Sequence, residues 1–258
     1  MGRLDGKNCI VTGAAGGIGL ETAILFAQNG ASVMMSDVNT GQLEIALAKA
    51  KKLVPGARIE SHQADVSVEP EVENLVAALD SWGGVDVIFN NAGIMHMDDG
   101  DAISCTEDVW DLTQKINVKG VWYGCKHAVL SFRKHNKKKA SVINTASVVA
   151  LVGSATAQVA YTASKGAVLA MTRELAMVHA REGFRFNSLC PAPLNTPLLQ
   201  NFLGDDQAKR HRHGCLLASD ESSFVIGQEM IVDGGMTRAY VTPEGPSVPA
   251  PLNNAFGR

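Results

Sequence analysis

The chain has 258 residues, and its 23 basic and 26 acidic side chains leave a formal net charge of −3 at pH 7. This mild acidity gives no electrostatic reason to expect nucleic acid or an anionic membrane as a partner. Apolar residues make up 46% of the sequence and charged residues 19%, which is typical of a globular protein.

Apolar runs alternate with helical stripes along the chain. Strands are predicted at 9–12, 31–37, 57–62, 85–90, 141–146, 185–190 and 224–232. Helices are predicted at 17–29, 42–53, 69–81, 106–135 and 159–182. Strands separated by helices require parallel pairing with right-handed crossovers. The sequence therefore predicts an α/β protein with a doubly wound parallel (Rossmann) sheet of about seven strands and helices on both faces.

The domain organisation follows from where linkers are missing. No linker divides the first 238 residues, so residues 1–240 are expected to form a single Rossmann-type domain. After Tyr240, four prolines fall within nine residues, and 241–258 is expected to be a Pro-rich, disordered tail.

The cellular compartment is inferred from the cysteines and from the apolar segments. The five cysteines are widely spaced and contain no Cys-x-x-Cys pair, which argues against a disulfide scaffold or a thiolate zinc site. The first ten residues lack the apolar stretch of a signal peptide. Residues 140–164 carry no charge, but polar residues and Gly153 interrupt them, so they are interpreted as a strand, a loop and a helix start. We therefore expect a cytoplasmic protein with no membrane partner.

A glycine-rich loop, TGAAGGIG (12–19), lies between the first predicted strand and the first predicted helix. Glycines there allow a sharp turn and let a pyrophosphate approach the free N–H groups of the helix N-terminus. Glycines also serve plain turns, but the strand before, the helix after and Asp37 at the end of the second strand favour dinucleotide binding. The cofactor-binding residues expected in this loop are Gly13, Gly17, Ile18 and Gly19.

Asp37 indicates which dinucleotide is bound. A carboxylate at this strand end can accept both adenosine ribose hydroxyls and would repel a 2′-phosphate. Neither Arg nor Lys occurs in 13–19 or 37–41 to attract that phosphate. The sequence therefore predicts NAD rather than NADP, with a plain helix or turn cap as the alternative role of Asp37.

A tyrosine and a lysine stand four residues apart on the predicted helix 159–182. Tyr161 and Lys165 therefore project from one face, and a neighbouring ammonium is expected to lower the pKa of the phenol towards working pH. Such a tyrosine can pass a proton to or from a hydroxyl or a carbonyl. A partly buried Tyr beside a snorkelling Lys is the alternative that the pair alone would favour.

Five motifs in one order resemble the short-chain dehydrogenase/reductase family, over a match that runs from about residue 4 to residue 238. They are TGAAGGIG (12–19), NNAG (90–93), INVKG (116–120), Ser147 and YTASK (161–165). The resemblance implies that Tyr161 is the acid/base and that Ser147 hydrogen-bonds the substrate oxygen. It also implies that Lys165 holds the nicotinamide ribose and that Asn117 holds a water in the proton relay, while the cofactor carries the hydride.

The resemblance assigns further residues to the cofactor site. Asp65 and Val66 would belong to the adenine pocket, and Leu194 and Thr196 would meet the nicotinamide carboxamide. The backbone wall beside the cofactor ribose would be formed by Asn91, Ala92 and Gly93.

Two residues near this site depart from the family pattern. Ala192 stands where the family usually has Gly, and its methyl would clash if that position needed a positive φ. Phe186 replaces a smaller β-branched residue in the preceding strand.

The region before the last strand is short. Only 36 residues separate Thr196 from Asp233, roughly twenty fewer than the family usually has. Of the expected crossover helix, only the end is predicted to survive, as LLASDES (216–222). Either 198–214 serves as both substrate cover and crossover, or the sheet loses cover near its last strand. A gene-model or splicing deletion is a further alternative.

These observations predict an NAD(H)-dependent oxidoreductase that interconverts a secondary alcohol and a ketone. The alternatives are an NADPH-dependent ketoreductase of a biosynthetic pathway and a catalytically impaired dinucleotide-binding protein. By family analogy Met95, Val148, Val149 and Leu151 would line the substrate pocket. The sequence predicts no metal site, because the spacing of Asp98, Asp99 and Asp101 fits a solvated turn better than a calcium loop.

The expected assembly is a homodimer, with a tetramer as the alternative. The resemblance implies that the helices carrying Asn117 and Tyr161 pack against their copies, and Val168, Met171 and Leu175 are expected on the outer face. The second interface of the family's tetramers uses the helix that is shortened here.

Overall fold

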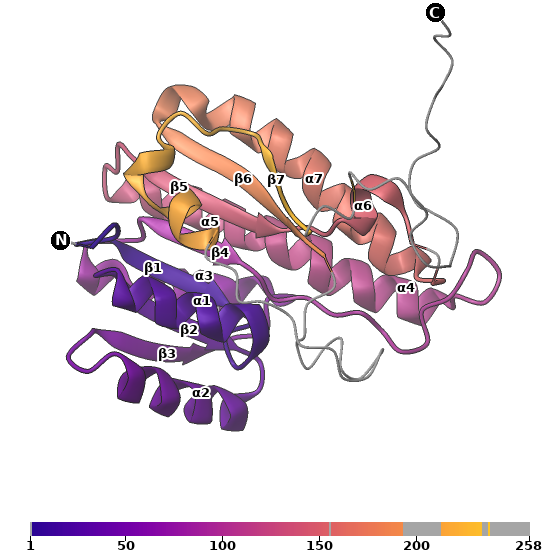
Figure 1. The fold of residues 1–258 in the computed structure, drawn as a ribbon, viewed down its shortest axis with the longest axis horizontal. Helices are drawn as coiled ribbons and strands as arrows, with labels where there is room; N and C mark the ends of the chain where they lie inside the picture. The colour runs from indigo at the N-terminus through magenta and orange to yellow at the C-terminus, as the bar shows by residue number, and fades with distance from the viewer. Residues whose placement is uncertain (1, 155, 193–212, 234–236, 238–258) are drawn as a thin grey trace, which may run out of the picture.

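The computed structural model describes residues 2–154, 156–192, 213–233 and 237. A seven-stranded parallel sheet has the order β3-β2-β1-β4-β5-β6-β7 (Figure 1). The strands are β1 (Asn8–Thr12), β2 (Ser32–Asp37), β3 (Ile59–Gln63), β4 (Val87–Asn90), β5 (Ala140–Thr145), β6 (Phe184–Pro191) and β7 (Glu229–Val232). The doubly wound parallel sheet expected from the sequence is confirmed, since chain order reverses direction at β1 and β4.

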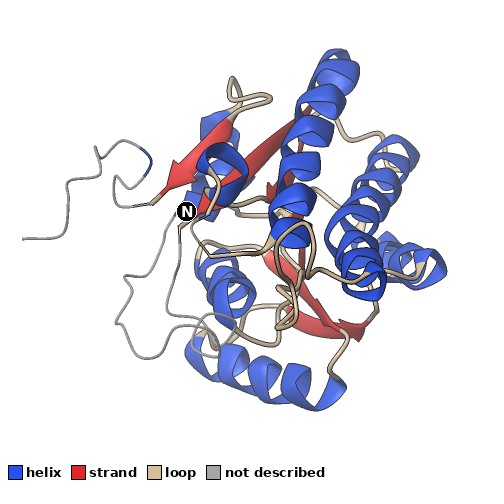
Figure 2. Ribbon diagram, turned by 90° about the vertical axis from the view of Figure 1, so that its right-hand side faces the viewer, coloured by secondary structure: helices blue, strands red, loops and turns tan. Residues whose placement is uncertain are grey.

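Helices connect these strands and cover both faces of the sheet (Figure 2). The α-helices are α1 (Gly17–Gln28), α2 (Thr40–Leu53), α3 (Glu69–Ala77), α4 (Glu107–Gln114), α5 (Gly120–Lys134), α6 (Val149–Val152), α7 (Val159–His179) and α9 (His213–Ala218). Within the described residues, no helix is both long and apolar enough to cross a membrane.

The apolar core is divided by the sheet into two layers. Alternate residues of a strand point to opposite faces, so Val87 and Phe89 join one layer while Ile88 of the same strand joins the other. The first layer includes residues of α1, α2 and α9, and the second includes residues of α3, α5 and α7. Because both faces are covered, β1, β4 and β5 are buried along their whole length, as their continuous apolar runs predict.

The helix predicted over 106–135 is present but interrupted. It begins beside Thr106, whose hydroxyl caps α4 by accepting the Val109 N–H, and it ends at Lys134. Between α4 and α5, residues Lys115–Lys119 form a π-helical turn that the sequence pattern did not reveal. Such turns often mark functional sites, and this one contains Asn117.

The crossover to the last strand contains a short helix. The helix α9 has six residues and precedes a 3-10 turn at Asp220–Ser222. The predicted loss of most of the crossover helix stays a prediction, because residues 193–212 lie outside the described part. Leu217 and Ala218 are buried and join the core layer that contains α1. Phe224 beyond the turn is 99% exposed, while Met230 and Ile231 of β7 pack partly against the two core layers. The predicted double role of 198–214 falls almost entirely outside the described residues.

The domain assignment stays a prediction. Residues 193–212 and 238–258, with the predicted tail at 241–258, lie outside the described residues.

Candidate active site

The glycine loop between β1 and α1 has a conformation that requires glycine. Gly13 has φ +64°, and a Cβ on it would lie 2.9 Å from the Ala92 Cα. A Cβ on Gly19 would lie 2.1 Å from the Gly13 carbonyl oxygen, and Gly17 has φ +52°. Larger residues at these positions would therefore force the loop open.

The space in front of this loop fits an anion. Among the described residues, no side chain caps the N-terminus of α1, and a Cβ on Gly16 would meet none of their atoms within 4 Å. The uncapped N–H groups, including that of Ile18, and the positive end of the helix dipole suit a pyrophosphate.

The loop is joined to the neighbouring strand end by Thr12. Its hydroxyl accepts the N–H groups of Asn91 and Ala92 at 3.0 and 3.1 Å. In return, the Asn91 amide nitrogen donates to the Thr12 carbonyl oxygen at 3.0 Å. These bonds hold the glycine loop against the expected wall at Asn91, Ala92 and Gly93, which places both parts of the expected cofactor site side by side.

Asp37 lies at the carboxyl end of β2 and contacts the same loop. One carboxylate oxygen accepts the Ala15 N–H at 3.1 Å, and the other accepts the Asn39 N–H at 3.0 Å. Asp37 therefore does act as a turn cap, which was the alternative role predicted for it. Each oxygen keeps a second lone pair, so a ribose hydroxyl can still be accepted.

Asp65 and Val66, which the resemblance places at the adenine, form a turn after β3. One Asp65 oxygen accepts the Ser67 N–H at 2.8 Å. Val66 packs so closely on the start of α5 that a Cβ on Gly120 would lie 2.8 Å from its methyl. The other expected cofactor residues, Leu194 and Thr196, lie outside the described residues.

Tyr161 and Lys165 stand on the first two turns of α7, and Ser147 follows β5. Lys165 is buried, and its Nζ donates to the Thr145 carbonyl oxygen at 2.8 Å. The same ammonium lies 5.5 Å from the centroid of the Tyr161 ring. The structure therefore brings the residues expected to carry the reaction together at the carboxyl edge of the sheet.

The expected lowering of the Tyr161 pKa is wrong for this structure. Burial raises the pKa of the phenol, and a side-chain hydrogen bond with Ser147 lowers it only in part. Burial also lowers the pKa of Lys165 to about 8. The physical reason is that removal from water disfavours both charged forms, while the ammonium faces the Tyr161 ring and the Thr145 oxygen.

Asn117 is buried in the π-helical turn, and its amide is fully engaged. Its Oδ1 accepts the Ile94 N–H at 2.8 Å, while its Nδ2 donates to the Ile94 carbonyl oxygen and to the Ser164 hydroxyl. A Cβ on Gly93 would lie 3.0 Å from Asn117 Oδ1 and 3.4 Å from Lys165 Nζ. Asn117 therefore orients the strand end beside Lys165, and its expected water-holding role stays a prediction.

The departures at Ala192 and Phe186 are accommodated. Asn136 alone has a positive φ among the described non-glycine residues, so Ala192 does not need glycine. Phe186 is fully buried, and its ring stacks on the His179 imidazole with 5.5 Å between centroids.

Sequence patterns missed Thr145, which holds Lys165, and Asp99, which binds the start of α7. Thr145 could have been noticed as the last residue of a strand, two before Ser147. Asp99 had no local signal, because its partners lie about 60 residues further along the chain.

In the described part of the chain, no group of three or more His, Cys, Asp or Glu side chains could hold a metal ion.

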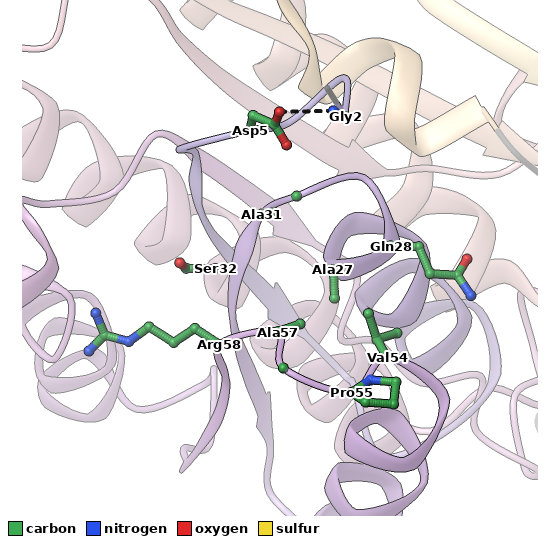
Figure 3. Close-up of a pocket in the computed structure, with 12 residues that line it drawn as sticks. Gly2, Asp5, Ala27, Gln28, Ala31, Ser32, Val54, Pro55, Ala57 and Arg58 are labelled. Carbon is green, nitrogen blue, oxygen red and sulfur yellow. Dashed lines mark hydrogen bonds between the residues drawn. The ribbon is translucent and has the colours of Figure 1, made fainter.

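A separate cavity of about 410 Å³ lies at the amino ends of the strands, away from their carboxyl ends (Figure 3). Its lining includes Asp5, Ser32 and Arg58, near the amino ends of β1, β2 and β3. None of the expected catalytic residues lines it. This cavity is therefore distinct from the candidate active site.

Comparisons with known proteins agree with this arrangement. Residues 13–237 match the family model described as enoyl-(acyl carrier protein) reductase. The chain is 34% identical over 256 residues to dehydrogenase/reductase SDR family member 6 of Xenopus laevis, covering 91% of this chain and 99% of that protein. It is 33% identical over 252 residues to the 3-oxoacyl-(acyl-carrier-protein) reductase FabG of Thermotoga maritima, with the same coverage of 91% and 99%.

A solved structure shows the same fold. The crystal structure of levodione reductase superposes with a TM-score of 0.85 at 30% identity, over 92% of this chain and all of that chain. Together with the matched family model and relatives, this shows that the chain belongs to the short-chain dehydrogenase/reductase family of oxidoreductases, which use NAD(P)H.

Proposed function

We propose that this protein is an NAD(H)-dependent oxidoreductase that interconverts a secondary alcohol and a ketone, with Tyr161 as the acid/base. The observation that carries the proposal is the grouping of Ser147, Tyr161 and buried Lys165 beside the glycine loop. A phenol, a hydroxyl and an ammonium in one buried group are suited to moving a proton at a substrate oxygen.

The residues fit a dinucleotide along the carboxyl edge of the sheet. The glycine loop and the α1 N-terminus would hold the pyrophosphate, and Asp37 would hold the adenosine ribose. Asp65 and Val66 would border the adenine, and Lys165 with the backbone of 91–93 would border the nicotinamide ribose. When bound, the cofactor supplies the hydride acceptor or donor.

The chain's own residues handle the proton. In ketone reduction, the Tyr161 phenol donates its proton to the substrate oxygen while the Ser147 hydroxyl donates a hydrogen bond to the same atom. In alcohol oxidation, the ionised Tyr161 accepts that proton. The Lys165 ammonium stabilises the phenolate, and its pKa of about 8 lets it exchange a proton near working pH.

Asp37 supports NAD over NADP. Its carboxylate would lie against the 2′ position of the adenosine ribose, where a phosphate would meet a like charge. The glycine loop and the turn after β2 contain neither Arg nor Lys to compensate.

A biosynthetic NADPH-dependent ketoreductase is the second candidate. The similarity to a 3-oxoacyl-(acyl-carrier-protein) reductase favours it, while the similarity to levodione reductase favours a small ketone. For the first candidate the partner is a small-molecule alcohol or ketone. A cytoplasmic location and a homodimeric state complete the proposal.

A substrate screen tests the proposed function. Secondary alcohols are offered with NAD+ or NADP+, and ketones with NADH or NADPH, while the absorbance of the reduced cofactor is followed. The proposal expects turnover with NAD(H), which Tyr161→Phe abolishes. A marked preference for NADP(H) would favour the second candidate, and binding of NADH without any turnover would favour the impaired dinucleotide-binding protein.

A further inference from the structure

The helix that carries Tyr161 is not capped by its own sequence. The side chain of Gln158, the residue before α7, makes no capping hydrogen bond. The first N–H groups of the helix nevertheless need acceptors. The acceptors come instead from the loop between β4 and α4. The Val159 N–H donates to the Gly100 carbonyl oxygen at 2.9 Å, and the two oxygens of Asp99 accept the N–H groups of Ala160 and Tyr161 at 3.1 and 2.8 Å.

This contact corrects the expectation of a solvated acidic turn. Asp99 is half-buried and faces the positive end of the α7 dipole, where a carboxylate is stabilising. Asp101 has a different task, because its Oδ1 accepts the N–H groups of Ile103 and Ser104 and so shapes the loop. Asp98, in contrast, has a side chain that is 83% exposed.

The loop is fixed at its other end as well. Asn117 holds both the N–H and the carbonyl oxygen of Ile94 at 2.8 Å. On α4, the Gln114 amide donates to the Ala160 carbonyl oxygen at 3.0 Å, which adds a second contact to the same turn of α7. The segment between Ile94 and Asp99, which contains His96, is therefore joined at one end to Asn117 and at the other to Tyr161.

We propose that Asp99 is a positioning residue for the reaction, which holds the backbone of Tyr161 so that the phenol stays aligned with Ser147. This role rests on the proposed function of Tyr161 as acid/base. A first helical turn without acceptors frays, and Tyr161 is the third residue of α7. A phenol displaced by about 1 Å loses the hydrogen-bond range that proton transfer needs. The Asp99 carboxylate, which belongs to a loop about 60 residues earlier in the chain, prevents this displacement of the phenol.

The test compares Asp99→Ala and Asp99→Asn with the matched control Asp98→Asn. In Asp99→Ala, kcat is expected to fall about tenfold while the dissociation constant for NADH stays within about twofold. Asp99→Asn is expected to recover part of kcat, because an Asn oxygen still accepts one N–H and Asn is a good cap. Asp98→Asn removes an equal charge from the neighbouring residue and is expected to leave both values unchanged.

Hydrogen–deuterium exchange of the substrate-free protein provides a readout that does not depend on turnover. The amides of Ala160 and Tyr161, which donate to the Asp99 oxygens, are expected to exchange faster in Asp99→Ala than in Asp98→Asn, with the rest of α7 unaffected. Equal exchange in the two variants would overturn the proposal, whether or not any substrate is turned over. A second outcome would also overturn it: kcat and NADH affinity fall equally, and amides exchange faster along all of α7. Asp99 would then be a general stabiliser of the helix. If the wild type turns over no alcohol or ketone, the proposed function fails, and the exchange result alone decides whether Asp99 holds Tyr161.

Discussion

The Nζ atom of Lys165 lies over the ring of Tyr161, 5.5 Å from its centroid, and donates to the Thr145 carbonyl oxygen instead of to the phenol. The ammonium therefore faces the tyrosine ring without a direct hydrogen bond to the phenol oxygen. The two residues are therefore expected to have separable tasks, because the Tyr161 phenol, and not the Lys165 ammonium, is hydrogen-bonded to Ser147.

Tyr161→Phe is expected to abolish turnover and to leave NADH binding within a few-fold of the wild type. The substitution removes the phenol proton and keeps the ring that packs beside Lys165. Lys165→Ala is expected to lower both turnover and NADH affinity, because the ammonium would face the nicotinamide ribose. Steady-state kinetics and a fluorescence titration with NADH measure the two effects. Comparable turnover in Tyr161→Phe would remove that residue from its role.

The directions of the two pKa shifts predict how the rate depends on pH. Oxidation needs ionised Tyr161 together with protonated Lys165. The pKa of Lys165 is about 8, while burial raises the pKa of Tyr161 from its ordinary value. Below about pH 8 the lysine stays charged and the phenolate fraction grows, so kcat/KM for oxidation rises up to tenfold per pH unit. Above about pH 8 lysine deprotonation cancels further phenolate formation, and a plateau follows. Ketone reduction needs the neutral phenol together with protonated Lys165. Burial raises the pKa of Tyr161 and keeps the phenol neutral, so reduction falls above about pH 8 through deprotonation of Lys165. An oxidation profile without a break would contradict the assignment.

Asp37→Ala is expected to weaken NAD binding and to improve NADP binding relative to it. The loss of a hydrogen bond to a charged group costs about 1.5–3 kcal/mol, which corresponds to roughly ten- to a hundredfold in affinity. Part of this effect can come from the glycine loop, because Asp37 also accepts the Ala15 N–H. Asp37→Asn keeps an acceptor and removes the charge, so it separates repulsion of the phosphate from loop support. A wild type that prefers NADP in a binding titration would show that the assignment is wrong.

The succession of strands and helices along the chain and the motifs of the candidate site could be predicted because they depend on local patterns. The alternation of Ile10 with Val11 along β1, the glycines after it and Tyr161 four residues before Lys165 are all short-range signals. The family resemblance then linked these separate segments to one site.

Contacts between distant segments could not be predicted in the same way. The π-helical turn at Asn117 is set by its bonds to Ile94 and Ser164, and the cap of α7 by Asp99. The direction of the Tyr161 pKa shift depends on burial, which a spacing of four residues does not report. Each of these features requires the folded arrangement.

Arg185→Met is expected to destabilise the short crossover. Arg185 on β6 is buried and donates to the carbonyl oxygens of Leu217 and Ser219, at 2.8 and 3.2 Å, which end the shortened helix α9. Losing the guanidinium removes two buried hydrogen bonds from a charged donor, while the two oxygens keep bonds from Ser141 and Ser222, and it costs about 1–3 kcal/mol in the free energy of unfolding. Urea denaturation measures the change. Arg133→Met removes an exposed guanidinium paired with Glu182 and is expected to cost less than about 1 kcal/mol. Equal effects would show that the crossover does not depend on Arg185.

The residues expected from the sequence to form the subunit interface are not exposed in the structure. Val168 is fully buried in the core, and Met171 and Leu175 pack partly against it, so these residues do not form an exposed apolar face. The outer stripe of α5 does expose apolar side chains, since Trp122 is 45% and Leu130 is 51% exposed. We therefore predict a dimer that uses this stripe, because the helix for a second interface is reduced to α9.

Light scattering behind a sizing column tests this prediction with Leu130→Asp. In a twofold contact each subunit contributes the same patch, so one substitution places two carboxylates in the interface and is expected to yield monomer. Ile45→Asp is the control, because Ile45 is 65% exposed on α2, which packs in the other core layer. It is expected to leave the dimer intact. A wild type that elutes as a single active tetramer would mean that a second interface forms despite the short α9. A dimer that Leu130→Asp leaves intact would mean that the contact does not involve this stripe of α5.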